Sequence, residues 1–313
     1  MIWSNQSRDE RDAIIRQRIA SGQFEVTWLP ITSAAKGHTA IFQVMADALK
    51  MDGVRINVSA TLEQQIADKI GASLLTPKLA DLRWMQRGTS LAPITRPIVM
   101  DTASMVTQSA AIDKAVAAKG GPSGIIATVG KDWVISNQLP KHPGKGENYG
   151  DHFEGQTWGN AKWESAVTPP FRVVQGQGWF HDPTHVDYSQ VCVLVRRDCV
   201  VDGVSRDIRD VMADPELAWL LSHDGKLSIT RQPGVPEQDP ISGGSANISA
   251  DNSGSGVIPP ILARQLPKTD MERAGVIGGL VGGAVLGGAV GGIPGMVVGA
   301  VVGAVCGKLW SSR

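Results

Sequence analysis

The sequence predicts an α+β fold: one globular domain with a mixed or antiparallel sheet, followed by a C-terminal hairpin of two helices. Helical spacing and helix-capping residues are concentrated in the first half of the chain. The second half instead carries short apolar runs between Gly and Pro residues, which is typical of strands. Beyond both, a glycine recurs at every fourth position from Gly275 to Gly307. The 313 residues suffice for one medium-sized domain with appendages.

The first elements follow from apolar periodicity. Residues 8–20 predict a short amphipathic helix, and residues 24–31 a strand. Residues 39–51 place apolar side chains at helical spacing, and Asp52-Gly53 ends that predicted helix. Residues 54–58 alternate between apolar and polar side chains, as a half-buried strand does.

Three further helices carry recognisable terminal signals. Ser59 or Thr61 is expected to cap the first, Pro77 takes the first helical position of the second, and Gly120-Gly121 ends the third. The three helices are expected over residues 59–70, 77–87 and 101–119.

The second half predicts mostly strands and loops. Asp202-Gly203 is a strong hairpin turn signal, and residues 211–221, which contain Asp214-Pro215, predict a closing helix. A loop-rich segment spans residues 147–170, where Trp158 and Trp163, with the later Trp179, are candidates to line a groove or to join the core. Strands are expected over residues 124–129, 133–136, 171–175 and 186–195.

Four segments are expected along the chain: a polar N-terminal helix over 1–22, an α+β domain over 23–235, a flexible linker over 236–272 and a helical hairpin over 273–313. The first segment carries charges throughout, so no secretory signal peptide is expected. The net charge is zero, with no cluster of Lys and Arg, which argues against a nucleic-acid partner. Cys192 and Cys199 are expected to be unpaired core thiols.

The glycine ladder predicts a membrane or helix-packing segment. Glycines four residues apart share one helical face, where a second backbone approaches closely in lipid. The uncharged stretch from Ala274 to Gly307 is too long for one span, and Pro294 divides it into two short ones. We therefore expect membrane lipid and self-association as partners; a Gly-rich tail outside any membrane is the alternative. In pattern, the segment resembles the glycine-zipper two-helix segments of bacterial envelope proteins, toxins and phage ejection proteins.

The candidate chemistry is a group of polar residues around a histidine. His185, Asp187 and Ser189 alternate along a predicted strand and would project from one face, and His152 is the best candidate for a third group. His152, His185 and Asp187 could ligate a divalent metal such as zinc and leave a position for an activated water. Without a metal, His185 would be a general base oriented by Asp187 or Asp151, with Ser189 as nucleophile or oxyanion donor. The plain alternative is polar alternation on a half-exposed strand.

Several short runs resemble a bacterial family of mostly uncharacterised proteins over about residues 40–235. The runs begin at Leu74, Lys131, Asn148 and His185 and include Tyr149, which the resemblance adds to the candidate site. This chain departs from the family pattern in having Asp151 where a tryptophan is typical and Gln190 where a histidine is typical. The family has no established activity, so the resemblance implies positions and no reaction.

Together these patterns predict a hydrolase domain for the bacterial cell envelope, acting on a cell-wall polymer of the peptidoglycan type and tethered to a membrane-inserting hairpin. Without a signal peptide, the chain would enter the membrane from the cytoplasm or be delivered by a phage or a secretion machine. The alternative is a non-enzymatic toxin or virion ejection protein whose globular domain only folds and delivers the hairpin.

Overall fold

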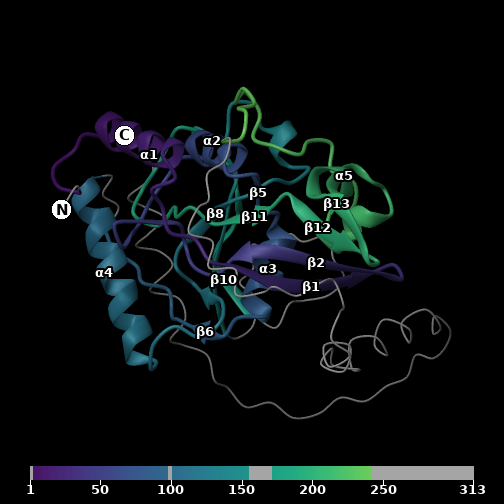
Figure 1. The fold of residues 1–313 in the computed structure, drawn as a ribbon, viewed down its shortest axis with the longest axis horizontal. Helices are drawn as coiled ribbons and strands as arrows, with labels where there is room; N and C mark the ends of the chain where they lie inside the picture. The colour runs from purple at the N-terminus through teal and green to yellow at the C-terminus, as the bar shows by residue number, and fades with distance from the viewer. Residues whose placement is uncertain (1–2, 98–100, 155–170, 242–313) are drawn as a thin grey trace, which may run out of the picture. The chain divides into compact units, whose positions relative to one another are not determined.

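A computed structural model describes residues 3–97, 101–154 and 171–241 (Figure 1). The chain divides into two units, residues 1–252 and residues 253–313. The glycine hairpin over 273–313, the linker beyond Ile241, and both Trp158 and Trp163 lie outside the described residues. Within the described ranges, no helix combines the length and the apolar character needed to cross a membrane.

The first unit is an α+β domain, as predicted. Its helices are α1 (Arg8–Ala20), α2 (Ala60–Lys69), α3 (Pro77–Met85), α4 (Thr102–Ala118) and α5 (Ile208–Ala213), with 3-10 turns η1 (Leu139–Lys141) and η2 (Leu217–Leu220). Its longer strands are β1 (Trp28–Ala35), β2 (His38–Met45), β9 (Asn148–Glu154), β10 (Phe171–Gly178), β12 (Asp198–Val201) and β13 (Val204–Asp207). The short strands are β3 (Lys50–Met51), β4 (Val54–Arg55), β5 (Ala72–Leu74), β6 (Thr89–Ser90), β7 (Ile126–Ala127), β8 (Lys131–Trp133) and β11 (Leu194–Arg196).

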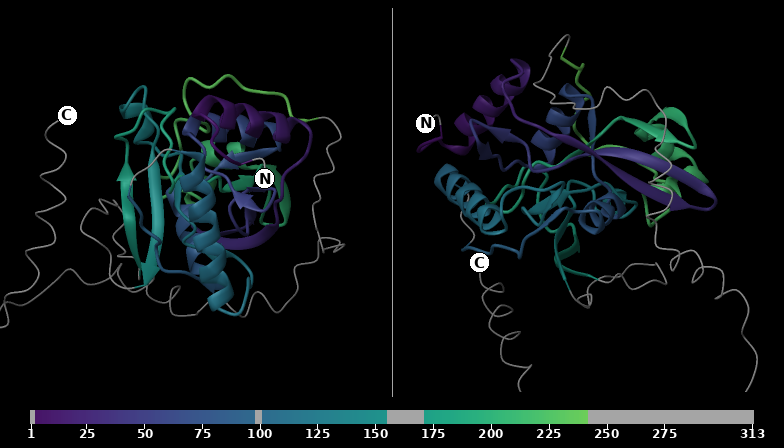
Figure 2. Two further views of the ribbon diagram at one scale, coloured as in Figure 1. Left: turned by 90° about the vertical axis from the view of Figure 1, so that its left-hand side faces the viewer. Right: turned by 60° about the horizontal axis from the view of Figure 1, so that its bottom comes forward.

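The main sheet is antiparallel and centred on β2. This strand pairs with β1 along one edge and with β11 and β12 along the other, so that Ile41 faces both Thr32 and Val200. On the outer side, β5 pairs with β11 and β13 pairs with β12. A second, three-stranded antiparallel sheet has the order β10-β9-β8. Figures 1 and 2 show the β1–β2 hairpin reaching to the side of the domain opposite α4.

The predicted helix over residues 39–51 is wrong, because this segment forms β2 and β3. Ala40, Phe42 and Val44 are buried and alternate with more exposed neighbours, which is the period of a strand. The hairpin is closed by Lys36 and Gly37, whose φ values of 49° and 82° match a two-residue turn with the twist of the flanking strands. The apolar residues also fit helical spacing, and the long-range pairing with β1 and β12 selects the strand over the helix.

The capped helices were predicted correctly. Ser59, rather than Thr61, caps α2, and its Oγ accepts a hydrogen bond from Leu62 N at 3.2 Å. Thr76 caps α3 directly before Pro77. Helix α1 buries Ile15 and Ile19 in the core, so the N-terminal helix is part of the domain rather than a separate segment.

Two elements of the second half differ from expectation. The strand predicted over residues 186–195 begins only at Leu194, because residues 186–193 run through a turn and irregular backbone. The predicted closing helix is interrupted at Asp214-Pro215, which separates α5 from η2. The hairpin turn at Asp202-Gly203 is confirmed, with φ values of 50° and 80°. Cys192 and Cys199 are free and buried, as expected.

Candidate functional site

Strands β8 and β9 carry the residues around which the candidate site is built. Their register places Lys131 opposite Gly150 and Asp132 opposite Tyr149. The loop after residue 180 is fastened to β8, because Lys131 N donates to Ser189 O at 2.6 Å. Gly130 allows this approach: a Cβ at that position would lie 2.4 Å from Ser189 O. Two clusters result, one around Asp81 and one around His185.

The Asp81 cluster consists of Asp81, Tyr149, His152 and His223. Asp81 Oδ1 accepts hydrogen bonds from Tyr149 Oη at 2.7 Å and from His152 Nε2 at 2.8 Å. Its Oδ2 accepts from His223 Nε2 at 2.9 Å. The Asp81 side chain is 5% exposed. Three donors, two from β9 and one from the segment after η2, therefore meet at a carboxylate of α3 that is almost entirely buried.

Two unusual backbone conformations let Tyr149 and His152 reach the same oxygen. In a regular strand, residues three positions apart point to opposite faces. Gly150 and Asp151 have φ values of 122° and 57°, which interrupt the alternation of β9. The rings of Tyr149 and His152 consequently meet edge to face, with centroids 5.3 Å apart.

Electrostatics keep the Asp81 carboxylate ionised. Burial by itself raises the pKa of Asp81, but the hydrogen bonds from His152 and His223 outweigh it and lower the pKa below its usual value. Burial and the adjacent Asp81 charge raise the pKa of Tyr149, so the phenol stays protonated and donates. The cluster therefore has the charge distribution of a buried anion held by three donors.

The proposed metal ligand set of His152, His185 and Asp187 is not assembled. His152 binds Asp81 through Nε2, and its ring stacks near Trp84 with a centroid distance of 6.1 Å. Across the described ranges, no group of three or more His, Cys, Asp or Glu side chains has an arrangement that could hold a metal ion. The physical reason is that the buried Asp81 charge requires His152 as a donor, which directs that ring away from a ligand role.

The His185 cluster consists of Lys131, His181, His185, Asp187 and Ser189. His185 Nε2 lies 3.7 Å from Asp187 Oδ2, and Lys131 Nζ lies 3.8 Å from the same oxygen. The rings of His181 and His185 stack in parallel with centroids 4.0 Å apart. The His185 side chain is 18% exposed and that of Asp187 is 3% exposed, so the imidazole lies between solvent and a buried carboxylate.

Asp187 is fixed by its own turn. Its Oδ1 accepts from Ser189 Oγ at 2.6 Å and from Ser189 N at 2.8 Å, while its backbone N donates to Gln190 Oε1 at 2.7 Å. Burial raises the pKa of Asp187, but the nearby His185 ring, the charge of Lys131 and the hydrogen bonds from Ser189 together hold the pKa far below its usual value. Asp187 is therefore a rigidly held anion next to His185.

The structure corrects the expected roles of Ser189 and of the strand. The three residues come together through a turn rather than along one strand face. The Ser189 hydroxyl donates to Asp187, so Asp187 stands between serine and histidine. In a Ser-His-Asp triad the histidine stands between the other two and takes the serine proton. Ser189 thus orients Asp187 and is not arranged as a nucleophile activated by His185.

Two buried carboxyl groups on β9 and β8, those of Asp151 and Asp132, have raised pKa values. Burial raises the pKa of Asp151 to about 6, with Lys131 opposing and Asp187 reinforcing the shift. Burial likewise raises the pKa of Asp132 to about 7, against the attraction of Arg83. Burial and the neighbouring His185 and Lys131 lower the pKa of His181 to about 4, so this imidazole is neutral near pH 7. The cluster therefore combines an ionised carboxylate with a carboxyl group that titrates near neutrality.

Asp81, His223 and Lys131 belong to these clusters although no local sequence pattern marks them as site residues. Asp81 lies within a helix whose residues are mostly buried, so no exposed polar face singled it out. His223 lies 142 residues from Asp81, and no local pattern links the two. Lys131 begins one of the runs that carry the family resemblance, but the resemblance implies no role for its charge.

No protein-family model, no curated protein and no solved structure matches this chain.

Proposed function

We propose that this chain is a hydrolase of the bacterial cell envelope in which His185 is the general base and Asp187 orients it. The observation that carries the proposal is the His185–Asp187 pair: a partly exposed imidazole with Nε2 3.7 Å from a carboxylate that Ser189 and Lys131 hold ionised. An ionised carboxylate beside a histidine orients the ring and stabilises the imidazolium that forms when the base takes a proton.

In this proposal His185 removes a proton from a water molecule that attacks the scissile bond of a cell-wall glycan or peptide. Asp187 remains an anion throughout and stabilises the protonated ring. Asp151 supplies the proton for the leaving group, because its pKa of about 6 leaves part of the population protonated near neutral pH. Environments that push two carboxyl pKa values apart are typical of acid and base assignments in hydrolases.

The test compares full-length His185→Ala and Asp187→Asn with the wild type on purified peptidoglycan, by release of soluble reducing sugars and free amines. His38→Ala is the matched control, because His38 also binds a carboxylate, Asp202, at 2.6 Å but lies at the exposed tip of the sheet. We expect a loss of about 100-fold or more for His185→Ala, the usual contribution of a general base. Activity equal to that of His38→Ala, or a wild type inactive on peptidoglycan, would refute the enzymatic proposal.

The glycine ladder from Gly275 to Gly307 supports a second part of the proposal, that the C-terminal segment inserts into a membrane and self-associates. It equally favours the competing function, a non-enzymatic toxin or ejection protein that delivers this segment to a bilayer. Deleting residues 272–313 separates the parts. We expect the truncated chain to lose liposome binding and to keep hydrolysis; retained liposome binding would refute the membrane role.

A further inference from the structure

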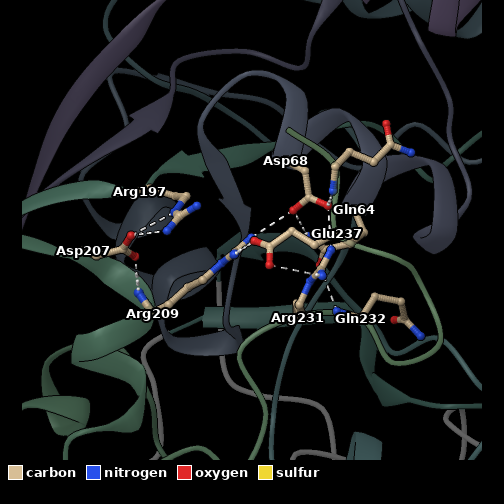
Figure 3. Close-up of polar contacts among 9 residues, drawn as sticks. Gln64, Asp68, Arg197, Asp207, Arg209, Arg231, Gln232 and Glu237 are labelled. Carbon is tan, nitrogen blue, oxygen red and sulfur yellow. Dashed lines mark hydrogen bonds and ion pairs between the residues drawn. The ribbon is translucent and has the colours of Figure 1, made fainter. Parts of the chain in front are cut away.

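Three arginines from separate segments meet beside α2, and none of them belongs to either histidine cluster. Figure 3 shows Arg197, Arg209 and Arg231 directed toward the carboxylates of Asp207, Asp68 and Glu237. Arg197 binds Asp207 through Nε at 2.9 Å and through Nη2, and Asp207 also caps α5. Asp207 also accepts from Arg209 N at 2.9 Å and balances the charge of Arg197, so the remaining chemistry belongs to the guanidinium groups of Arg209 and Arg231.

The second group consists of Arg209 and Arg231, and the buried carboxylate of Asp68 lies at its centre. The Asp68 side chain is 1% exposed; Oδ1 accepts from Arg209 Nη2 at 2.9 Å and Oδ2 from Arg231 Nη2 at 2.6 Å. Gln64 Nε2 donates to Oδ1 as well, at 3.0 Å. Asp68 therefore fixes two guanidinium groups side by side and neutralises one of their two positive charges.

Glu237 supplies the second negative charge from the outside. Its Oε1 lies 2.5 Å from Arg209 Nη1 and its Oε2 lies 3.9 Å from Arg231 Nη1, so its carboxylate sits between the two guanidinium groups (Figure 3). The Glu237 side chain is nevertheless 57% exposed. The segment on either side of it is anchored by other contacts, because Gln232 N donates to Gln64 Oε1 and Ile241 N to Lys69 O. The Glu237 side chain can thus rotate away while the segment stays in place.

Both guanidinium groups keep unused donors. The Nε atoms of Arg209 and Arg231 are buried and have no hydrogen-bond partner among the described residues. Buried donors without partners are rare in folded proteins and are commonly satisfied by a water or an ion. Two arginines with one buried aspartate leave a single positive charge, which matches an external oxyanion that takes the place of Glu237.

The geometry points to an anion site at Arg209 and Arg231 that binds a phosphate group, with Glu237 as its internal competitor. Paired guanidinium forks match the oxygens of phosphate better than single ammonium groups do. A tetrahedral phosphate also offers more acceptor oxygens than the planar carboxylate of Glu237 does. The phosphate group comes either from a soluble phosphate compound or from a phospholipid headgroup, and the experiment separates these sources.

The test measures binding of inorganic phosphate to the full-length protein by equilibrium dialysis. Glu237→Gln removes the competing charge, and we expect phosphate to bind at least 10-fold more tightly than to the wild type. Glu216→Gln is the matched control, because Glu216 is an exposed glutamate paired with Lys36 at 3.8 Å; it should bind like the wild type. Adding Arg231→Lys to Glu237→Gln keeps the charge but removes the fork, and this should abolish the gain.

Cosedimentation with phosphatidylglycerol vesicles, compared with phosphatidylcholine vesicles, identifies the source. A gain for Glu237→Gln over Glu216→Gln on phosphatidylglycerol assigns the site to a lipid headgroup; a gain with inorganic phosphate alone assigns it to a soluble phosphate. Unchanged binding of Glu237→Gln to both probes overturns the proposal. So does equal binding by Glu237→Gln and its Arg231→Lys double variant, provided that both show the thermal unfolding of a folded chain.

Discussion

The carboxylate of Asp81 on α3 accepts a hydrogen bond from His223, 142 residues further along the chain, at 2.9 Å. Tyr149 and His152 donate to the other oxygen of the same carboxylate. One buried charge therefore ties together α3, β9 and the segment after η2. Such a network is costly to disrupt, because removing one member leaves the others buried without a partner.

Asp81→Asn is expected to destabilise the domain by about 3–5 kcal/mol, the usual cost of breaking a buried charged network. Asparagine replaces one accepting oxygen of Asp81 with an NH2 group, which would face a histidine nitrogen that also donates, so at least one hydrogen bond is lost. Chemical denaturation monitored by tryptophan fluorescence measures the change. Asp198→Asn removes an exposed carboxylate paired with Arg196 and should cost well under 1 kcal/mol. Equal effects for the two variants would contradict a structural role for the cluster.

The stability of the domain should fall between pH 5 and pH 8. Burial raises the pKa of Asp132 and Glu147 to about 7 and that of Asp151 to about 6, so the folded state binds more protons than the unfolded state in this range. Their contribution is complete below the ordinary carboxyl pKa and is lost as pH rises through the raised values. His181, with a pKa lowered to about 4, acts in the opposite direction up to about pH 6.5.

Urea unfolding at pH 5 and pH 8 tests this balance. We expect the wild type to be less stable at pH 8 by more than about 1 kcal/mol, the value of one pKa unit. Asp132→Asn should reduce the difference, because the amide does not ionise. A free energy of unfolding that rises from pH 5 to pH 8 would show that the buried carboxyl groups do not determine how stability depends on pH.

Glu63→Gln should be nearly neutral for stability, whereas Glu63→Ala should cost about 1–3 kcal/mol. Glu63 is fully buried, and burial together with nearby Asp132 raises its pKa well above the usual value, which favours the uncharged form of the side chain. Its Oε1 accepts from Val193 N at 3.1 Å, a bond that glutamine retains and alanine removes. Thermal unfolding of the two variants side by side distinguishes these outcomes; a large loss for Glu63→Gln would indicate an ionised carboxylate.

Asp68→Asn should loosen the segment after Arg231 and the contact of Arg209 on α5, while α4 stays unchanged. Asp68 binds the Arg231 guanidinium and accepts from Gln238 N at 3.3 Å. Hydrogen exchange read by mass spectrometry should show peptides over 231–241 exchanging at least 10-fold faster, with α4 as the unchanged internal reference. Uniformly faster exchange in both regions would mean that Asp68 supports the whole fold rather than this segment.

The sequence predicted correctly those features that depend on neighbouring residues. Ser59 and Thr76 precede α2 and α3 and accept from backbone N–H groups three positions later, so the helix starts are visible locally. Asp202-Gly203 likewise sets a turn through its own φ values. The histidine-carboxylate pairing of His185 with Asp187 was also accessible, because only one residue separates them.

Tertiary contacts decided the rest. Residues 39–45 follow a pattern compatible with helix or strand, and pairing with β1 and β12 selects the strand. The sequence pattern groups His152 with His185, but the buried Asp81 carboxylate binds His152 instead. The same holds for Glu237, whose partner Arg209 lies 28 residues away. Helix caps and turns depend on residues that are adjacent in the sequence. The partner of a buried charge depends instead on which distant segments the fold brings within hydrogen-bonding distance.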